Sequence, residues 1–85
     1  MSTVVQAFDR HDQLPPHSIE AEQSVLGSML LSQDAIIDVS EILEPEDFYK
    51  EAHAIIYRAA LQLFASGEPV DPVTLSETLR AQGNL

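Results

Sequence analysis

Two histidines in this sequence, His17 and His53, have neighbours that could take part in chemistry. Ser18 follows His17, and a serine beside a general base is the minimum for nucleophilic catalysis. A serine directly before an apolar helical pattern is, however, typical of a helix N-cap. His53 follows Glu46 and Asp47 by a few residues, but the HExxH and EF-hand spacings of metal sites are both missing. We therefore predict no catalytic residue and no metal ligand, and a structural or exposed role for His53.

The glycine pattern does not support a nucleotide site. A phosphate-binding loop needs closely spaced glycines followed by Lys and Ser or Thr, so that backbone amides surround the anion. The three glycines, Gly27, Gly67 and Gly83, are far apart, and none precedes such a pair. The sequence therefore predicts no bound cofactor and no ATPase activity for this chain.

The composition is dominated by acidic residues. Fourteen Asp and Glu residues stand against four Lys and Arg residues, which gives a net charge of −10. Nucleic acid binding requires cations that displace counterions from phosphates, and an anionic membrane repels the chain for the same reason. The absence of cysteine fits a reducing, cytoplasmic setting. Two expectations remain: a protein partner with a basic surface, or an acidity that only maintains solubility.

The first half of the chain predicts an arm and two helices. Residues 1–13 show no sustained period and are expected to form a flexible arm. A first helix is expected over residues 19–31, with Ser18 as its N-cap. A second helix is expected to be capped by Asp34 and to end at Pro45, because proline has no amide to donate.

The second half of the chain predicts two further helices. The first of these ends at Gly67, and Pro69 prevents its continuation. Asp71 is expected to cap the last helix, with Pro72 at its first position. Apolar residues at spacings of three and four predict the core-facing stripe of the third helix: Ala52, Ile55, Ile56, Ala59, Leu63 and Phe64.

Four capped helices joined by short loops predict an all-α fold, a small orthogonal helical bundle over residues 14–85. Residues 44–49 are expected to form a short helical turn with two aromatic anchors. Ser18, Pro45, Asp71 and Pro72 are assigned to caps and stops. The predicted core includes Phe48, Tyr49, Ile55, Ile56, Leu63 and Phe64.

Two other classes of protein share this size and charge. Acyl and peptidyl carrier domains are small acidic bundles with a prosthetic arm on a serine at a helix start. The nearest approach to their Asp-Ser-Leu pattern is Asp-Val-Ser at residues 38–40, which lies inside a predicted helix. An acidic mimic of DNA would need carboxylates at phosphate-like spacing on one face, and none is evident. A stand-alone acidic carrier or adaptor domain is kept as the alternative.

Four segments of the chain resemble the N-terminal domain of bacterial replicative DNA helicases, the DnaB family. Residues 14–27 (LPPHSIEAEQSVLG) are similar to its opening. Residues 42–49 (ILEPEDFY) resemble its L-x-P-E-D-F-Y turn, and residues 52–57 (AHAIIY) its A-H-x-x-I-F/Y pattern. Residues 67–75 (GEPVDPVTL) resemble its G-x-P-x-D-x-V-T-L helix entry. The four segments occur in the order that the family shows.

This resemblance implies a function that composition does not reach. Helicases of the family are homohexamers that use ATP and Mg²⁺ to unwind DNA in the bacterial cytoplasm. Their helical N-terminal heads form a collar implicated in subunit association and primase docking, and a separate RecA-like motor carries the ATP site. The resemblance therefore implies a non-catalytic docking domain whose partners are primase and other helicase subunits.

The resemblance also implies candidate docking residues, and the chain differs from the family pattern at its C-terminal end. Glu20, Glu22 and Gln23, at the start of the first helix, are the candidate partner-binding residues. A carboxylate that serves only the helix dipole is the competing interpretation of Glu20. The family continues beyond residue 85 into a Gly-Gly-x-x-Tyr-Leu segment and a helical hairpin. We therefore expect a truncated head domain, which leaves its capacity to oligomerise open.

Overall fold

A computed structural model of the protein describes residues 18–84. Their elements are α2 (Ile19–Leu31), α3 (Gln33–Ser40), the 3-10 turn η2 (Pro45–Asp47), α4 (Glu51–Ala65) and α5 (Pro72–Ala81). Every regular element in this part of the chain is helical, so the predicted all-α class is confirmed. The flexible arm predicted at residues 1–13 lies outside the described residues.

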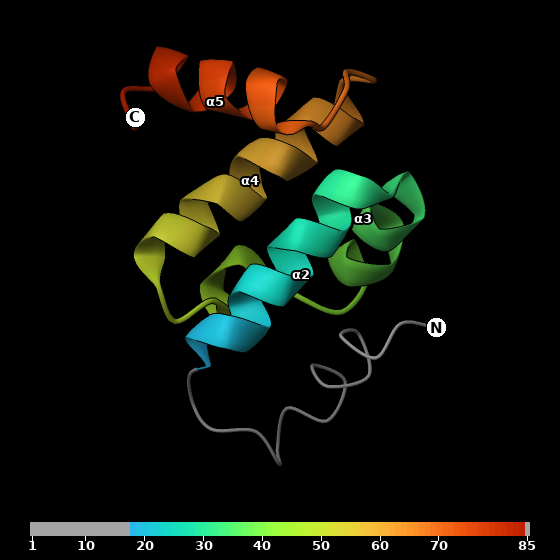
Figure 1. Ribbon diagram of the computed structural model, residues 1–85, viewed down its shortest axis with the longest axis vertical. Helices are drawn as coiled ribbons and strands as arrows, with labels where there is room; N and C mark the ends of the chain where they lie inside the picture. The colour runs from blue at the N-terminus through green and yellow to red at the C-terminus, as the bar shows by residue number, and fades with distance from the viewer. Residues whose placement is uncertain (1–17, 85) are drawn as a thin grey trace.

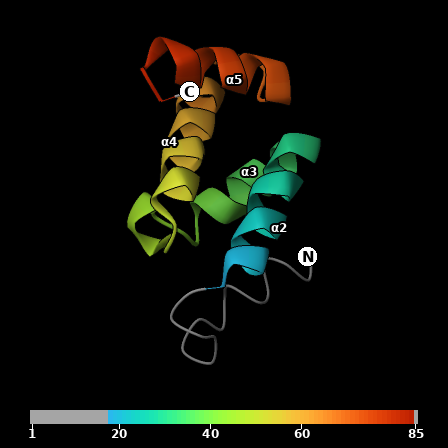
Figure 2. The same ribbon diagram turned by 60° about the vertical axis from the view of Figure 1, so that its left-hand side comes forward.

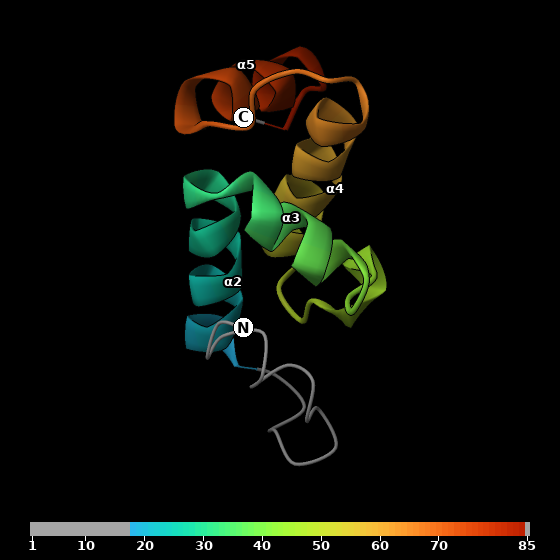
Figure 3. The same ribbon diagram turned by 90° about the vertical axis from the view of Figure 1, so that its right-hand side faces the viewer.

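All the other elements pack against α4 (Figures 1 and 2). α2, α3 and η2 contact α4 on one side of the molecule, and α5 contacts α4 at its C-terminal end. α5 lies across the C-terminal end of α4 rather than alongside it, as Figure 3 shows from the side. This transverse packing is the arrangement expected of an orthogonal bundle. Within residues 18–84, no helix is long and apolar enough to cross a membrane.

Two of the helix starts are capped by the residues that the sequence predicts. The Ser18 hydroxyl accepts a hydrogen bond from the amide of Ala21 at 3.3 Å. Asp71 Oδ1 accepts one from the amide of Thr74 at 2.8 Å, and Pro72 occupies the first position of α5. This bond to Thr74 also lowers the pKa of the Asp71 carboxyl, because it stabilises the charged form.

The boundaries predicted for the second helix are wrong at both ends. Ser32, not Asp34, is the N-cap of α3, and its hydroxyl accepts from the amide of Ala35 at 3.4 Å. Its own amide donates to the Ser28 carbonyl, so this one residue ends α2 and begins α3. At the other end, α3 stops at Ser40, before Pro45. Pro45 instead begins η2, where its missing amide costs no hydrogen bond.

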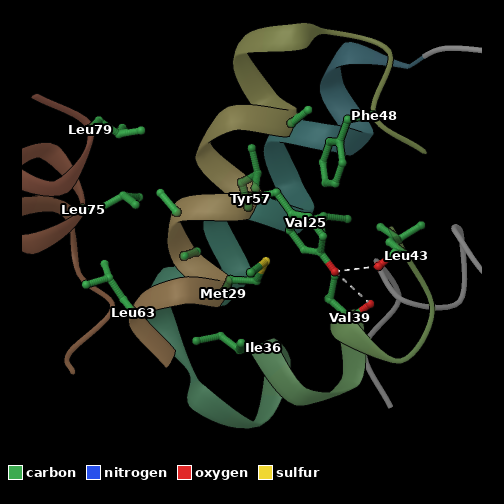
Figure 4. Packing of buried hydrophobic residues seen from close by; sticks show 14 residues of the cluster. Val25, Met29, Ile36, Val39, Leu43, Phe48, Tyr57, Leu63, Leu75 and Leu79 are labelled. Carbon is green, nitrogen blue, oxygen red and sulfur yellow. Dashed lines mark hydrogen bonds between the residues drawn. The ribbon is translucent and has the colours of Figure 1, made fainter. Parts of the chain in front are cut away.

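The hydrophobic core lies between α2, α3 and α4 and extends to α5 (Figure 4). Tyr57 is fully buried at its centre, and the Phe48 ring lies 4.9 Å from the Tyr57 ring, centroid to centroid. Phe48 and Leu63 are buried as predicted, whereas Ile55, Ile56 and Phe64 are partly buried and pack against the core. The buried apolar residues are Val25, Leu26, Met29, Ile36, Val39, Leu43, Phe48, Ala54, Tyr57, Ala59, Ala60, Leu63, Leu75 and Leu79.

Tyr49 is the predicted core residue that the structure places on the surface. Its side chain is 62 % exposed, while that of Phe48 is 6 % exposed. Phe48 has an extended backbone, with φ −84° and ψ 127°, and successive side chains on an extended backbone point in opposite directions. Burial of Phe48 therefore directs Tyr49 outward, and the second aromatic anchor is a surface residue.

The buried face of α4 is rotated from the predicted stripe. Ala52 is exposed, while His53, Ala54, Tyr57 and Ala60 are buried. The predicted stripe included only apolar residues. Two of the four buried residues that it left out, His53 and Tyr57, carry polar groups. Those polar groups find hydrogen-bond partners inside the fold.

Candidate docking surface and the polar contacts beneath it

Glu22 joins the start of α2 to the start of α4. Its side chain is 3 % exposed. Glu22 Oε2 accepts a hydrogen bond from the amide of Tyr49 at 2.6 Å. Glu22 Oε1 accepts from His53 Nδ1 at 2.8 Å and, over a longer 3.4 Å, from the amide of Lys50. One carboxylate thus collects three donors from the segment that begins α4.

These contacts make Glu22 a cap for a helix to which it does not belong. Lys50 is the N-cap residue of α4, and its side chain makes no capping bond. The first amides of a helix have no partner within the helix, and the helix dipole favours negative charge there. The Glu22 carboxylate brings negative charge to this end from α2 and accepts from the amide of the N-cap residue Lys50, so it stabilises the α2–α4 packing and the start of α4 together.

The placement of Glu22 corrects its assignment as a docking residue. A side chain that is buried and fully engaged inside the domain cannot also contact a partner from the folded surface. Glu20 and Gln23 are exposed on α2, so the remaining candidates of the predicted surface are accessible. The sequence contained a signal for this: Glu22, Val25, Leu26 and Met29 follow the spacing of one helical face. A glutamate in an apolar stripe indicates a buried carboxylate with a partner.

His53 is engaged with Glu22 rather than with the acids just before it in the sequence. Its Nδ1 carries the hydrogen in this contact, since the carboxylate has none to give when ionised. Among residues 18–84, no group of three or more His, Cys, Asp or Glu side chains is placed to hold a metal ion. The geometry therefore gives His53 a structural role, in the pairing of α2 with α4.

Tyr57 is a second buried polar residue, and its hydroxyl lies at the C-terminal end of α3. Its hydroxyl donates to the Leu43 carbonyl at 2.8 Å and lies 3.4 Å from the Val39 carbonyl (Figure 4). Burial, together with the nearby negative charges of Glu44 and Asp47, raises the pKa of Tyr57 to about 12. The hydroxyl therefore keeps its proton and donates to carbonyls at the end of α3 (Val39) and just after it (Leu43). Its apolar surroundings did not suggest this role in the sequence.

Exposed side chains surround these contacts. Glu20, Gln23 and Tyr49 are exposed near the ends that Glu22 joins. Elsewhere, Leu31 at the end of α2 is 89 % exposed and Val73 in the first turn of α5 is 68 % exposed. Exposed apolar side chains of this size are common at protein interfaces but do not themselves identify one.

The serine of the carrier-like segment lies in the wrong place for a prosthetic arm. Ser40 is the last residue of α3, and its hydroxyl donates to the Ile37 carbonyl at 2.8 Å. The attachment serine of a carrier domain stands at a helix start. The geometry therefore disfavours the carrier alternative.

The fold and its internal contacts define a small all-α domain in which the buried polar groups tie helix ends together. The chain belongs to the family described as "DnaB-like helicase N terminal domain", whose model matches residues 14–85. The resemblance in four sequence segments is thereby confirmed.

Relatives of known name and structure agree with this family. The chain is 47 % identical over 74 residues to the replicative DNA helicase DnaB of Leifsonia xyli and 50 % identical over 74 residues to that of Geobacillus stearothermophilus. Each match covers 87 % of this chain and 16 % of the relative, so the chain spans about a sixth of their length. The crystal structure of the N-terminal domain of DnaB helicase from Mycobacterium tuberculosis is 54 % identical, with a TM-score of 0.81. That match covers 85 % of this chain and 50 % of the solved one.

Proposed function

We propose that this chain is the non-catalytic collar and docking domain of a hexameric replicative DNA helicase. The observation that carries the proposal is the family match over residues 14–85, in a fold that is similar to a solved DnaB N-terminal domain. The matched relatives are themselves replicative DNA helicases. The domain would support association between helicase subunits and interaction with primase during DNA replication.

The chemistry of the whole protein would lie outside this chain. The parent would be an ATP-dependent helicase of the bacterial cytoplasm, with ATP and Mg²⁺ in its motor domain. The glycines of this chain are too widely spaced for a phosphate-binding loop, which supports a division of labour between head and motor. The head would contribute contacts with proteins.

A protein partner agrees better with the charge of the domain than a nucleic acid does. A net charge of −10 repels a phosphate backbone and attracts a basic protein surface, which raises the rate of encounter. Glu20 and Gln23 lie three residues apart on α2, so they share one exposed helical face. This face is the proposed primase contact.

A charge reversal at Glu20 tests this proposal. The Glu20→Arg variant should bind primase more weakly by about tenfold, since a rim charge pair turned into repulsion costs on the order of 1–2 kcal/mol. Affinity for purified primase would be measured by titration calorimetry at low and at moderate salt, and the difference should shrink as salt screens the charges. Circular dichroism would confirm that the helical content is unchanged.

Glu77→Arg provides the matched control, because Glu77 is exposed on α5 and carries the same charge. This control should bind primase nearly as well as the unmodified chain. Equal affinity of both variants and the unmodified chain would rule out the α2 face, and absence of any primase binding would rule out the docking role itself.

A further inference from the structure

The buried polar contacts of the fold join α2, α3 and α4, and none of them reaches α5. The Glu22 carboxylate connects α2 with α4, and the Tyr57 hydroxyl connects α4 with the end of α3. Within residues 18–84, one hydrogen bond joins α5 and its C-cap to another helix. It runs from Gln82 Nε2 to Gln62 Oε1 at 2.9 Å, and it is exposed. Water competes for an exposed bond of this kind, so α5 is held mainly by apolar packing.

Two buried leucines supply most of the apolar packing of α5. Leu75 and Leu79 point towards α4, from which Leu63 points back (Figure 4), and Val70, just before α5, is partly buried. The other side chains of α5 are partly or fully exposed. α5 packs chiefly against α4, whereas α2, α3 and α4 also pack against one another. A ten-residue helix is marginal on its own in water, so burial of these leucines keeps α5 helical.

The segment between α4 and α5 has the properties of a hinge. Gly67, just after α4, has φ +74°, a left-handed conformation that glycine adopts at low cost. The amide of Glu68 donates to the Leu63 carbonyl at 2.9 Å and closes the end of α4. In the described part of the chain, the three residues after Glu68 donate no backbone hydrogen bond, and the first of them, Pro69, has no amide. A rotation in this stretch would therefore break no backbone hydrogen bond of either helix.

We propose that α5 is a lid on the end of α4: residues 70–84 open as one unit about residues 67–69 while α2, α3 and α4 stay folded. Opening uncovers Leu63, Leu75 and Leu79 and breaks no buried hydrogen bond of the described residues, whereas separation of α2 from α4 strips a buried carboxylate of its donors. Proteins open first where the fewest buried contacts are lost. The open state thus carries an apolar surface that the closed domain hides. This inference goes beyond the docking function and does not depend on it.

Amide hydrogen exchange of the 85-residue chain, followed by NMR at increasing urea concentrations, tests the lid. The amides from Leu75 to Leu79 should exchange through one common opening, at least about tenfold faster than the slowest amides of α4. Their exchange should also respond less steeply to urea, because opening of the lid exposes less surface than unfolding of the whole domain.

Ile36→Val separates opening of the lid from unfolding of the whole domain. Ile36 is fully buried on α3, so the loss of one methylene group there should speed exchange of the slowest α4 amides by about fivefold. Because α3 stays folded when the lid opens, exchange from Leu75 to Leu79 should remain within about twofold of the unmodified chain.

Leu79→Ala weakens the closed lid directly. It should speed exchange in α5 by about a hundredfold, while the slowest α4 amides remain protected. Val73→Ala is the matched control, because Val73 lies on the exposed side of the same helix, and it should stay within about threefold. Complete loss of protection in α5 of Leu79→Ala, with α4 still protected, would show the lid standing open and would also support the inference.

Three results would overturn the inference. Exchange in α5 as slow as the slowest in α4, or equal acceleration of both helices by Ile36→Val, would show that α5 unfolds only with the whole domain. Rates that rise steadily towards the C-terminal end of α5 would show fraying of a helix end in place of a lid.

Discussion

Glu22 Oε1 and His53 Nδ1 lie 2.8 Å apart, although 31 positions separate the two residues in the chain. Both side chains are buried, and the contact joins the first turns of α2 and α4. A buried carboxylate is costly unless donors surround it, and here two backbone amides complete the set. Because these bonds form only when α2 and α4 are correctly placed, the buried pair favours one specific alignment of the two helices.

Removal of the Glu22 carboxylate should destabilise the domain strongly. Glu22→Ala leaves the Tyr49 and Lys50 amides and His53 without their acceptor, and loss of one partner from a buried pair costs about 3 kcal/mol. Urea denaturation followed by circular dichroism would measure the free energy of unfolding. Glu77→Ala on the exposed side of α5 should stay within about 0.5 kcal/mol of the unmodified chain. Similar values for the two variants would contradict the capping role.

The Tyr57 hydroxyl should contribute to stability through the carbonyls that it satisfies. Tyr57→Phe keeps the ring contact with Phe48 but leaves the Leu43 carbonyl without its donor, at a cost of about 1–3 kcal/mol. Tyr57→Leu also removes the ring and should cost more. If Tyr57→Phe unfolds at the same urea concentration as the unmodified chain, water has replaced the hydroxyl without loss.

Tyr57 should also make the domain sensitive to strongly alkaline solution. Its pKa rises from 10.0 to about 12 in the folded chain, so the folded state holds the proton more tightly than the unfolded one. The resulting stabilisation is fully present below pH 10 and is lost as the pH rises towards about 12. Melting temperatures measured across this window should fall in the unmodified chain and fall less in Tyr57→Phe. Parallel curves would show that ionisation of Tyr57 is not coupled to unfolding.

Asp71 should stabilise α5 more strongly while it is charged. The Thr74 amide lowers the pKa of the Asp71 carboxyl below 3.8, so its stabilisation is present above that value and is lost as the pH falls through the lowered pKa. Asp71→Asn keeps a capping oxygen but carries no charge, and Asp71→Ala keeps neither. At neutral pH the melting temperatures should rank unmodified chain, Asp71→Asn, Asp71→Ala. In acid, the unmodified chain and Asp71→Asn should converge, and a constant difference between them would exclude the charge effect.

Local patterns determined the four helices of residues 18–84 and two of their starts. Ser18, Asp71 and Pro72 act within three or four residues of their own position, so their roles depend on short-range backbone geometry alone. The start of α3 shows the limit of this reasoning. Ser32 and Asp34 can both cap a helix, and the close junction with α2, in which the Ser32 amide ends one helix and its hydroxyl begins the next, selects Ser32.

Tertiary packing decided which polar and aromatic side chains lie inside. The sequence by itself determined an acidic, all-helical domain of the DnaB-like N-terminal family, because charge, periodicity and motifs are properties of the chain. It did not determine that Glu22 is buried and Tyr49 exposed, because each outcome depends on partners from a distant segment. Burial of a carboxylate is favourable only where the Tyr49 and Lys50 amides and His53 converge on it, and that convergence exists only once α2 and α4 have packed together.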